Sequence, residues 1–163
     1  MPANTLPRTG LPGPTSWLLL GGTTLGSLDI LFAFAFWAPQ GVTLTRILQS
    51  IAAGLLGRPS YEGGIATAWL GAGLHYFIAT MMVLACYLVA RRFPGLLRRP
   101  LVFGPLYGLL LYGVMNFIVL PLSAAGTPDF ANAAWVTSSI AMHAVFGWIC
   151  FVFARRALAA SRP

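Results

Sequence analysis

Residues 17–37, WLLLGGTTLGSLDILFAFAFW, decide the fold of this 163-residue chain. The stretch is long enough to cross a bilayer, because a transmembrane helix needs about 20 mainly apolar residues. It carries a single charged residue, Asp29. An ionisable side chain at membrane depth costs about 2.5–3.5 kcal/mol even on lenient scales, so it is by default a hypothesis of function.

The composition of the whole chain agrees with a membrane protein. Hydrophobic residues make up 58% and charged residues 8%, whereas a soluble domain has about 25% charged residues. The net charge of +7 comes from ten arginines against three acidic residues. These arginines stand at the ends of apolar segments and are not interleaved with aromatics, which excludes a nucleic-acid surface and predicts the lipid bilayer as the partner.

The apolar segments predict an all-α integral membrane protein made of two helical hairpins. The expected spans are residues 17–37, 65–90, 101–120 and 131–154. Residues 1–16 are rich in proline and predict a flexible tail, and residues 157–163 form a C-terminal tail. Other membrane-protein subunits are a further class of partner.

Residues 43–57 have a helical period but are too short to span a membrane, so they predict an interfacial helix in the first loop. Its polar positions are Arg46, Gln49 and Ser50. These side chains either lie at the level of the lipid headgroups or form a lid that touches His75 and Asn116 from the outer side.

The distribution of arginine predicts the orientation. Eight arginines fall on one side of the four expected spans and two, Arg46 and Arg58, on the other. The side rich in arginine is normally cytoplasmic. Both termini are therefore expected in the cytoplasm, with the protein in the inner (cytoplasmic) membrane.

The two hairpins resemble each other. Gly22-x3-Gly26-x12-Pro39 matches Gly104-x3-Gly108-x12-Pro121, and CYLVARR at 86–92 matches CFVFARR at 150–156. Parallel repeats of this kind are related by an axis along the membrane normal. The polar residues break the repeat, because the aligned pairs are Asp29 with Leu111, His75 with Ser139, Asn116 with Phe34, and His143 with Ala79.

Four polar side chains are expected at membrane depth: Asp29, His75, Asn116 and His143. Each lies on a helical face with small residues, which favours a position between helices. At 1.5 Å per residue, Asp29 and His143 lie about 18 Å from the cytoplasmic ends and the other two about 24 Å. The predicted contacts are therefore Asp29 with His143, and His75 with Asn116.

Three interpretations follow, and none of them involves catalytic residues or an enzyme. The first is a structural or accessory membrane subunit whose polar side chains stabilise the bundle. The second is a small proton-coupled transporter, because a carboxylate beside an imidazole can hold or pass a proton near neutral pH. The third is ligation of haem by His75 and His143, or of a metal by these two with Asp29, although no cofactor is predicted in the first two cases.

Several short motifs resemble a known group of proteins. They are Gly26-x-Leu-Asp29, Leu48-Gln-Ser-Ile-Ala-x-Gly54, Met115-Asn116 and Leu120-Pro-Leu-Ser123. Together with the helix that carries His75, they are similar to small uncharacterised four-helix proteins of bacterial inner membranes and, more distantly, to the YagU family. The resemblance implies the bacterial inner membrane as the location and adds no activity.

Overall fold

The computed structural model describes residues 12–161, and no strand occurs among them. Four helices are long and apolar enough to cross a membrane, which confirms the predicted all-α fold with four spans. They are α1 (Pro14–Trp37), α3 (Gly64–Arg92), the segment that starts with α4 (Pro100–Val114), and α6 (Ala133–Ala160).

Helices α1 and α6 extend at least three residues beyond their predicted spans. Helix α1 begins at Pro14 and not at residue 17, because proline suits the first helical position, where its missing N–H would have no partner. Helix α6 continues past Arg155 and Arg156 to Ala160. The predicted C-terminal tail is therefore helical over residues 157–160, where alanine and leucine favour the helix.

The third span changes its winding near its outer end. After α4, residues Met115–Val119 form a π-helical segment, η4, and Leu120–Leu122 form α5. In the π-helical segment the Leu120 N–H bonds to the carbonyl of Met115. Pro121 follows within α5, where a missing N–H is tolerated, so the proline does not end the helix at residue 120 as predicted.

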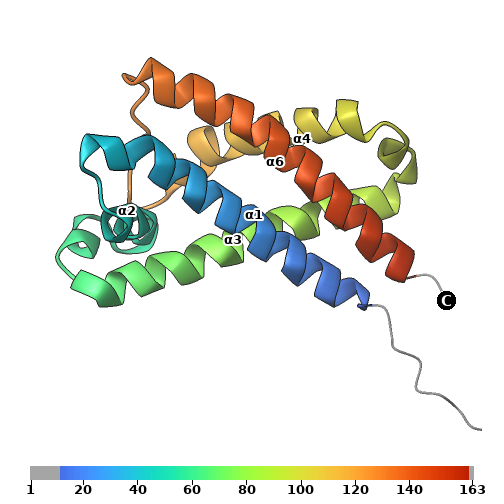
Figure 1. Ribbon diagram of the computed structural model, residues 1–163, viewed down its shortest axis with the longest axis horizontal. Coiled ribbons are helices and arrows are strands. Elements are labelled where there is room, and N and C mark those ends of the chain that lie inside the picture. Colours follow the sequence, from blue (N-terminus) through green and yellow to red (C-terminus); the bar gives the residue numbers. More distant parts are fainter. Residues whose placement is uncertain (1–11, 162–163) are drawn as a thin grey trace, which may run out of the picture.

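The short helix predicted over residues 43–57 is α2 (Leu44–Leu56), with Thr43 as its N-cap. Three short 3-10 segments join the longer helices: η1 (Ala38–Gln40), η2 (Arg58–Tyr61) and η3 (Pro94–Arg98). Figure 1 shows α2 nearly end-on at one end of the bundle. The start of α1 and the end of α6 lie together at the opposite end.

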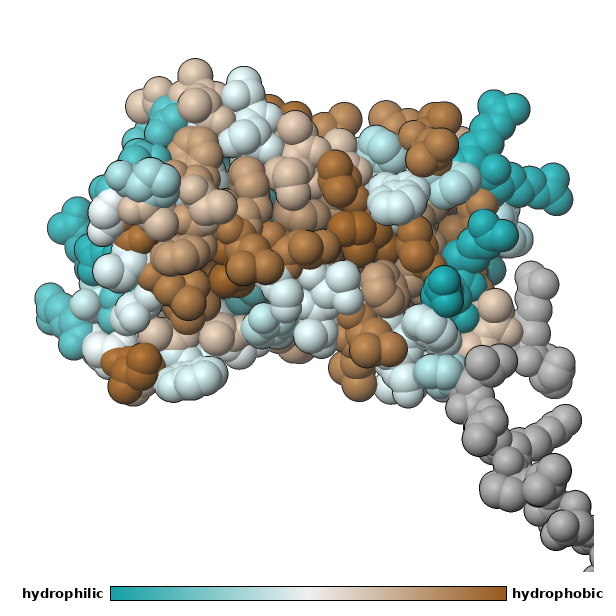
Figure 2. Space-filling model, viewed as in Figure 1, coloured by the Kyte–Doolittle hydropathy of each residue, from teal (hydrophilic) through white to brown (hydrophobic). Residues whose placement is uncertain are grey.

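Helix α6 is the centre of the bundle. It packs against α1, α3 and α4, while α1 packs against α3 and α2 lies on the first turns of α3. The view in Figure 2 shows a hydrophobic middle and hydrophilic groups gathered at both ends of the long axis. This distribution is typical of a protein that crosses a bilayer along that axis.

Glycines allow α4 and α6 to approach each other closely. A Cβ atom at Gly108 would collide with the carbonyl of His143, and one at Gly147 would collide with the backbone of Gly104 and Gly108. Small residues at such contacts let the backbones of membrane helices touch, which increases dispersion contacts where no hydrophobic effect operates. Helix α4 is therefore held against α6 by backbone contact.

Burial follows the sequence repeat at the end of the bundle where α1 begins. Positions of α3 and α6 that differ by 64 in number are buried in both helices. The equivalent pairs are Val83 with Gly147, Cys86 with Cys150, Tyr87 with Phe151, and Ala90 with Ala154. The first helix of each hairpin packs differently, however: Gly22 faces Thr80, whereas the equivalent Gly104 faces Trp148, one helical turn further along.

Replacement of Gly108 by alanine is expected to destabilise the fold by about 1–3 kcal/mol, because the added methyl group must push α4 away from α6. Gly113→Ala in the same helix is the matched control, since nothing lies within 4 Å of its added Cβ. Reversible unfolding of the purified protein in detergent measures both. Equal stability of the two variants would contradict the backbone contact.

Candidate functional site

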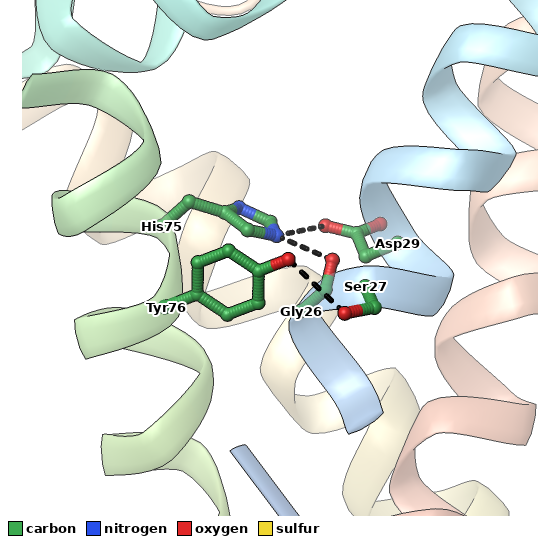
Figure 3. A network of polar contacts seen from close by, with 5 residues as sticks. All are labelled: Gly26, Ser27, Asp29, His75 and Tyr76. Carbon is green, nitrogen blue, oxygen red and sulfur yellow. Dashed lines mark hydrogen bonds and ion pairs between the residues drawn. The ribbon is translucent and has the colours of Figure 1, made fainter. Parts of the chain in front are cut away.

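Asp29 and His75 come together where α1 crosses α3. The His75 Nε2 atom lies 3.9 Å from the Asp29 Oδ2 atom and 2.9 Å from the carbonyl oxygen of Gly26 (Figure 3). A carbonyl oxygen only accepts hydrogen bonds, so Nε2 carries a hydrogen and donates it to Gly26. The Nδ1 atom is then the ring nitrogen that carries no hydrogen in the neutral imidazole.

A second polar contact lies next to this pair. The hydroxyl groups of Ser27 and Tyr76 are 3.0 Å apart, and the ring of Tyr76 covers Gly26 (Figure 3). The sequence interpretation missed both residues, although Tyr76 follows His75 directly and Ser27 precedes Asp29 by two positions. Together the two contacts hold α1 against α3 around the carboxylate.

The predicted direct contacts of Asp29 with His143 and of His75 with Asn116 are not the ones found in the described part of the chain. The Nδ1 atom of His143 bonds to the carbonyl of Ser139 at 2.8 Å, and the Asn116 amide donates to the carbonyl of Tyr112 at 2.9 Å. Both bonds stay within one turn of their own helix. The prediction assumed that equal numbers of residues from the helix ends give equal depths in the membrane. Helix α1 crosses α3 at an angle in Figure 1, so equal residue counts do not give equal depths.

All four predicted polar residues nevertheless line one cavity of about 540 Å³. Asp29 comes from α1, His75 from α3, Asn116 from η4 and His143 from α6. The Asp29 side chain is 38% exposed and the His75 side chain 12%, so the carboxylate is the more accessible partner. Since ligand pockets commonly measure about 300–1,000 Å³, the cavity is of a size that holds a small molecule.

One end of the cavity is formed by α2 and the segment that follows it. Arg46 and Ser50 line the cavity, and Arg46 stacks on the ring of Tyr61 with 3.7 Å from its Cζ atom to the ring centroid. The Ala124 N–H bonds to the carbonyl of Gly54 at 2.9 Å and ties α2 to the loop after α5. The amphipathic helix therefore closes one end of the cavity.

Gln49 differs from its prediction as a residue at the headgroup level. Its side chain is buried and its Nε2 atom donates to the carbonyl of Gly64 at 3.0 Å, with the Thr67 hydroxyl 3.4 Å away. The packing of α2 against the start of α3 encloses the amide and supplies its partners. Gln49 therefore joins two helices and does not belong to the lid.

Aromatic side chains also contribute to the cavity wall. Trp37 and Trp135 both line the cavity, with their ring centroids 5.3 Å apart. The Trp135 ring also stacks on Phe32 at 5.4 Å. Their places at the outer ends of α1 and α6 were the available signal, because tryptophan gathers near membrane interfaces.

The π-helical segment places Asn116 at the cavity. Such segments interrupt the regular hydrogen-bond ladder and are frequent at functional sites. Here the segment changes the winding of one turn of the third span, Met115–Val119. Three of its residues line the cavity: Met115, Asn116 and Val119. No sequence signal other than the nearby Pro121 points to it.

No group of three or more His, Cys, Asp or Glu side chains arranged for a metal ion occurs within residues 12–161. The haem interpretation requires a free nitrogen on both histidines. The Nε2 atom of His75 bonds to Gly26, and the Nδ1 atom of His143 bonds to Ser139. Each histidine keeps its other ring nitrogen, Nδ1 of His75 and Nε2 of His143, outside these bonds, so the haem and metal interpretations stay predictions.

Comparison of the chain with protein-family models, with curated proteins and with solved structures finds no match. The resemblance to the YagU family therefore stays a prediction. The functional proposal rests on the residues and geometry of the cavity.

His75→Ala is expected to lower the unfolding free energy by about 0.6–1.7 kcal/mol, because it removes a hydrogen bond between α1 and α3. His143→Ala, which removes the same side chain but a bond within one helix turn, should cost less. Unfolding in detergent compares the two. If His143→Ala proves the more costly, the assignment of His75 as the histidine that joins two helices is wrong.

Proposed function

We propose that this protein is a small multi-pass protein of the bacterial inner membrane that binds a small organic cation in its cavity and exchanges it for a proton at Asp29. The observation that carries the proposal is the meeting of the four predicted polar side chains, Asp29, His75, Asn116 and His143, at one cavity. Intramembrane ionisable groups that face a cavity mark solute and proton pathways.

The hydrogen bonds argue against a mainly structural role for the polar residues. Of the four, His75 alone has a described hydrogen bond to another helix. The Asp29 carboxylate has no hydrogen bond among the described contacts, and the nearest ionisable side chain that could pair with it, His75, lies 3.9 Å away. A carboxylate that served only to join helices would be expected to accept bonds from them.

The chemistry of the wall suggests the class of solute. Apolar and aromatic side chains surround the one carboxylate of the cavity, and its one arginine, Arg46, lies at the end formed by α2 and stacks on Tyr61. A carboxylate in apolar and aromatic surroundings suits a cation with an apolar body. A proton and an organic cation then compete for the same carboxylate. When Asp29 takes up a proton it loses its charge and releases the cation, and when the proton leaves, a new cation can bind with the charge of the cavity unchanged.

Asp29→Asn is expected to abolish this exchange, because an amide neither pairs with a cation nor releases a proton. The assay uses vesicles with a pH-sensitive dye inside and benzyltrimethylammonium outside, a permanent cation that cannot cross lipid as a neutral base. Wild-type vesicles should release internal protons when the probe is added. The initial rate in Asp29→Asn vesicles should fall to that of protein-free vesicles.

Asp129→Asn is the matched control, since it makes the same chemical change in the outer loop, outside the residues that line the cavity. It should keep the wild-type rate. Wild-type flux no faster than that of protein-free vesicles would refute the exchange function, and equal loss in both variants would refute the role of Asp29.

We also propose that both termini are cytoplasmic, on the basis of the eight arginines on their side of the spans. The two native cysteines are buried, so a cysteine introduced at Ser161 should be the reactive one. In intact bacterial cells it should resist a membrane-impermeant maleimide, whereas a cysteine at Ala125 in the outer loop should be labelled. The opposite labelling pattern would reverse the orientation.

A further inference from the structure

A second pocket, of about 850 Å³, lies at the end of the bundle where α1 begins and α6 ends. Three arginines line it: Arg91 from α3, Arg98 from η3 and Arg155 from α6. They belong to elements that are distant in sequence, and the fold brings them to one place. Apolar side chains, including Leu97 and Leu158, complete the wall.

The paired arginines at this end of the bundle occupy two different kinds of position. Each of the three Arg-Arg pairs sends one member to the pocket and the other elsewhere. Arg92 stacks on Phe93 with 5.1 Å from its Cζ atom to the ring centroid, and Arg156 stacks on Trp17 at 5.0 Å. Arg91 and Arg155 are equivalent in the sequence repeat, so the two halves of the chain supply the pocket symmetrically.

None of the three guanidinium groups has an acidic partner among the described residues. The chain has only three acidic residues: Asp29 lies in the first cavity, and Glu62 and Asp129 lie in the loops at the other end. Repulsion between three like charges around one pocket costs free energy unless an anion is bound. Within residues 12–161 the pocket thus concentrates positive charge with no acidic side chain to balance it.

The hydroxyl groups at the pocket have no hydrogen left to donate. Ser161 donates to the carbonyl of Ala157 at 2.8 Å, so the Tyr87 hydroxyl must be the donor in its 3.2 Å contact with Ser161. The arginines are therefore the side-chain donors for a ligand. Helix α4 begins at Pro100, which also lines the pocket, and the positive end of its dipole adds to the attraction of an anion.

We propose that this pocket binds the phosphate groups of an anionic phospholipid with Arg91, Arg98 and Arg155. Guanidinium groups match the geometry of phosphate oxygens through paired hydrogen bonds. Basic pockets between spans at the cytoplasmic side bind diphosphate headgroups, and the apolar wall gives the first carbons of an acyl chain a surface. A lipid with two phosphates, such as cardiolipin, best balances three arginines. The proposal requires the membrane location but not the exchange activity of the first cavity.

The test compares two triple variants of the full chain with the same loss of charge. One replaces Arg91, Arg98 and Arg155 by glutamine, and the other replaces their neighbours Arg92, Arg99 and Arg156. Purified protein in a zwitterionic detergent is titrated with cardiolipin, phosphatidylcholine or inorganic pyrophosphate, and the thermal unfolding midpoint is recorded. Cardiolipin should raise the midpoint of the wild type and of the neighbour variant, with at least tenfold weaker apparent affinity in the pocket variant.

Equal weakening in both triple variants would overturn the proposal, because it would mean that only the total charge matters. An effect of pyrophosphate at the same concentration as cardiolipin would overturn the assignment to a lipid in favour of a soluble phosphate. Should the pocket triple variant fail to fold, Arg98→Gln against Arg99→Gln repeats the comparison at the link between α3 and α4. There, equal affinities in the two single variants would overturn the proposal.

Discussion

The close backbone contact of α4 with α6 is the constraint on which the rest of the structure depends. Gly104, Gly108 and Gly147 leave no room for a side chain between these two helices. Because α4 is drawn onto α6, it packs less against α1 and α3, and a cavity remains among the four spans. Helix α2 covers one end of this first cavity.

The sequence was sufficient to predict the four spans, the short helix and the identity of the polar residues at the cavity. Each of these depends on a local property: the length of an apolar run, helical periodicity, or a polar residue on a face of small ones. The contact partners of Asp29 and His75 depend on the angles at which the helices cross. Those angles follow from side-chain packing at positions such as Gly26 and Tyr76, which no residue count along a helix contains.

The same distinction separates Gln49 from its predicted place. A polar position on a short amphipathic helix predicts exposure only while that face is free of protein. The start of α3 covers it and supplies the carbonyl of Gly64 as a partner. Trp37 and Trp135 likewise satisfy the rule for interfacial aromatics and also close the cavity, because the outer ends of α1 and α6 lie together.

The differences between the two halves of the sequence repeat make the first cavity asymmetric. Three of the four polar residues at the cavity have repeat equivalents that also line it: Asp29 with Leu111, His75 with Ser139, and His143 with Ala79. The two halves of the chain therefore face the same cavity with equivalent positions. The carboxylate–imidazole contact lies within the first hairpin, and the equivalent positions of the second hairpin carry an aliphatic side chain and a hydroxyl group. A solute with one charged end would therefore bind in a single orientation, with its charge toward the crossing of α1 and α3 and its apolar body toward α4. A symmetric pair of carboxylates would have held two cations or repelled each other, so a single carboxylate is what the proposed exchange of one solute for one proton requires.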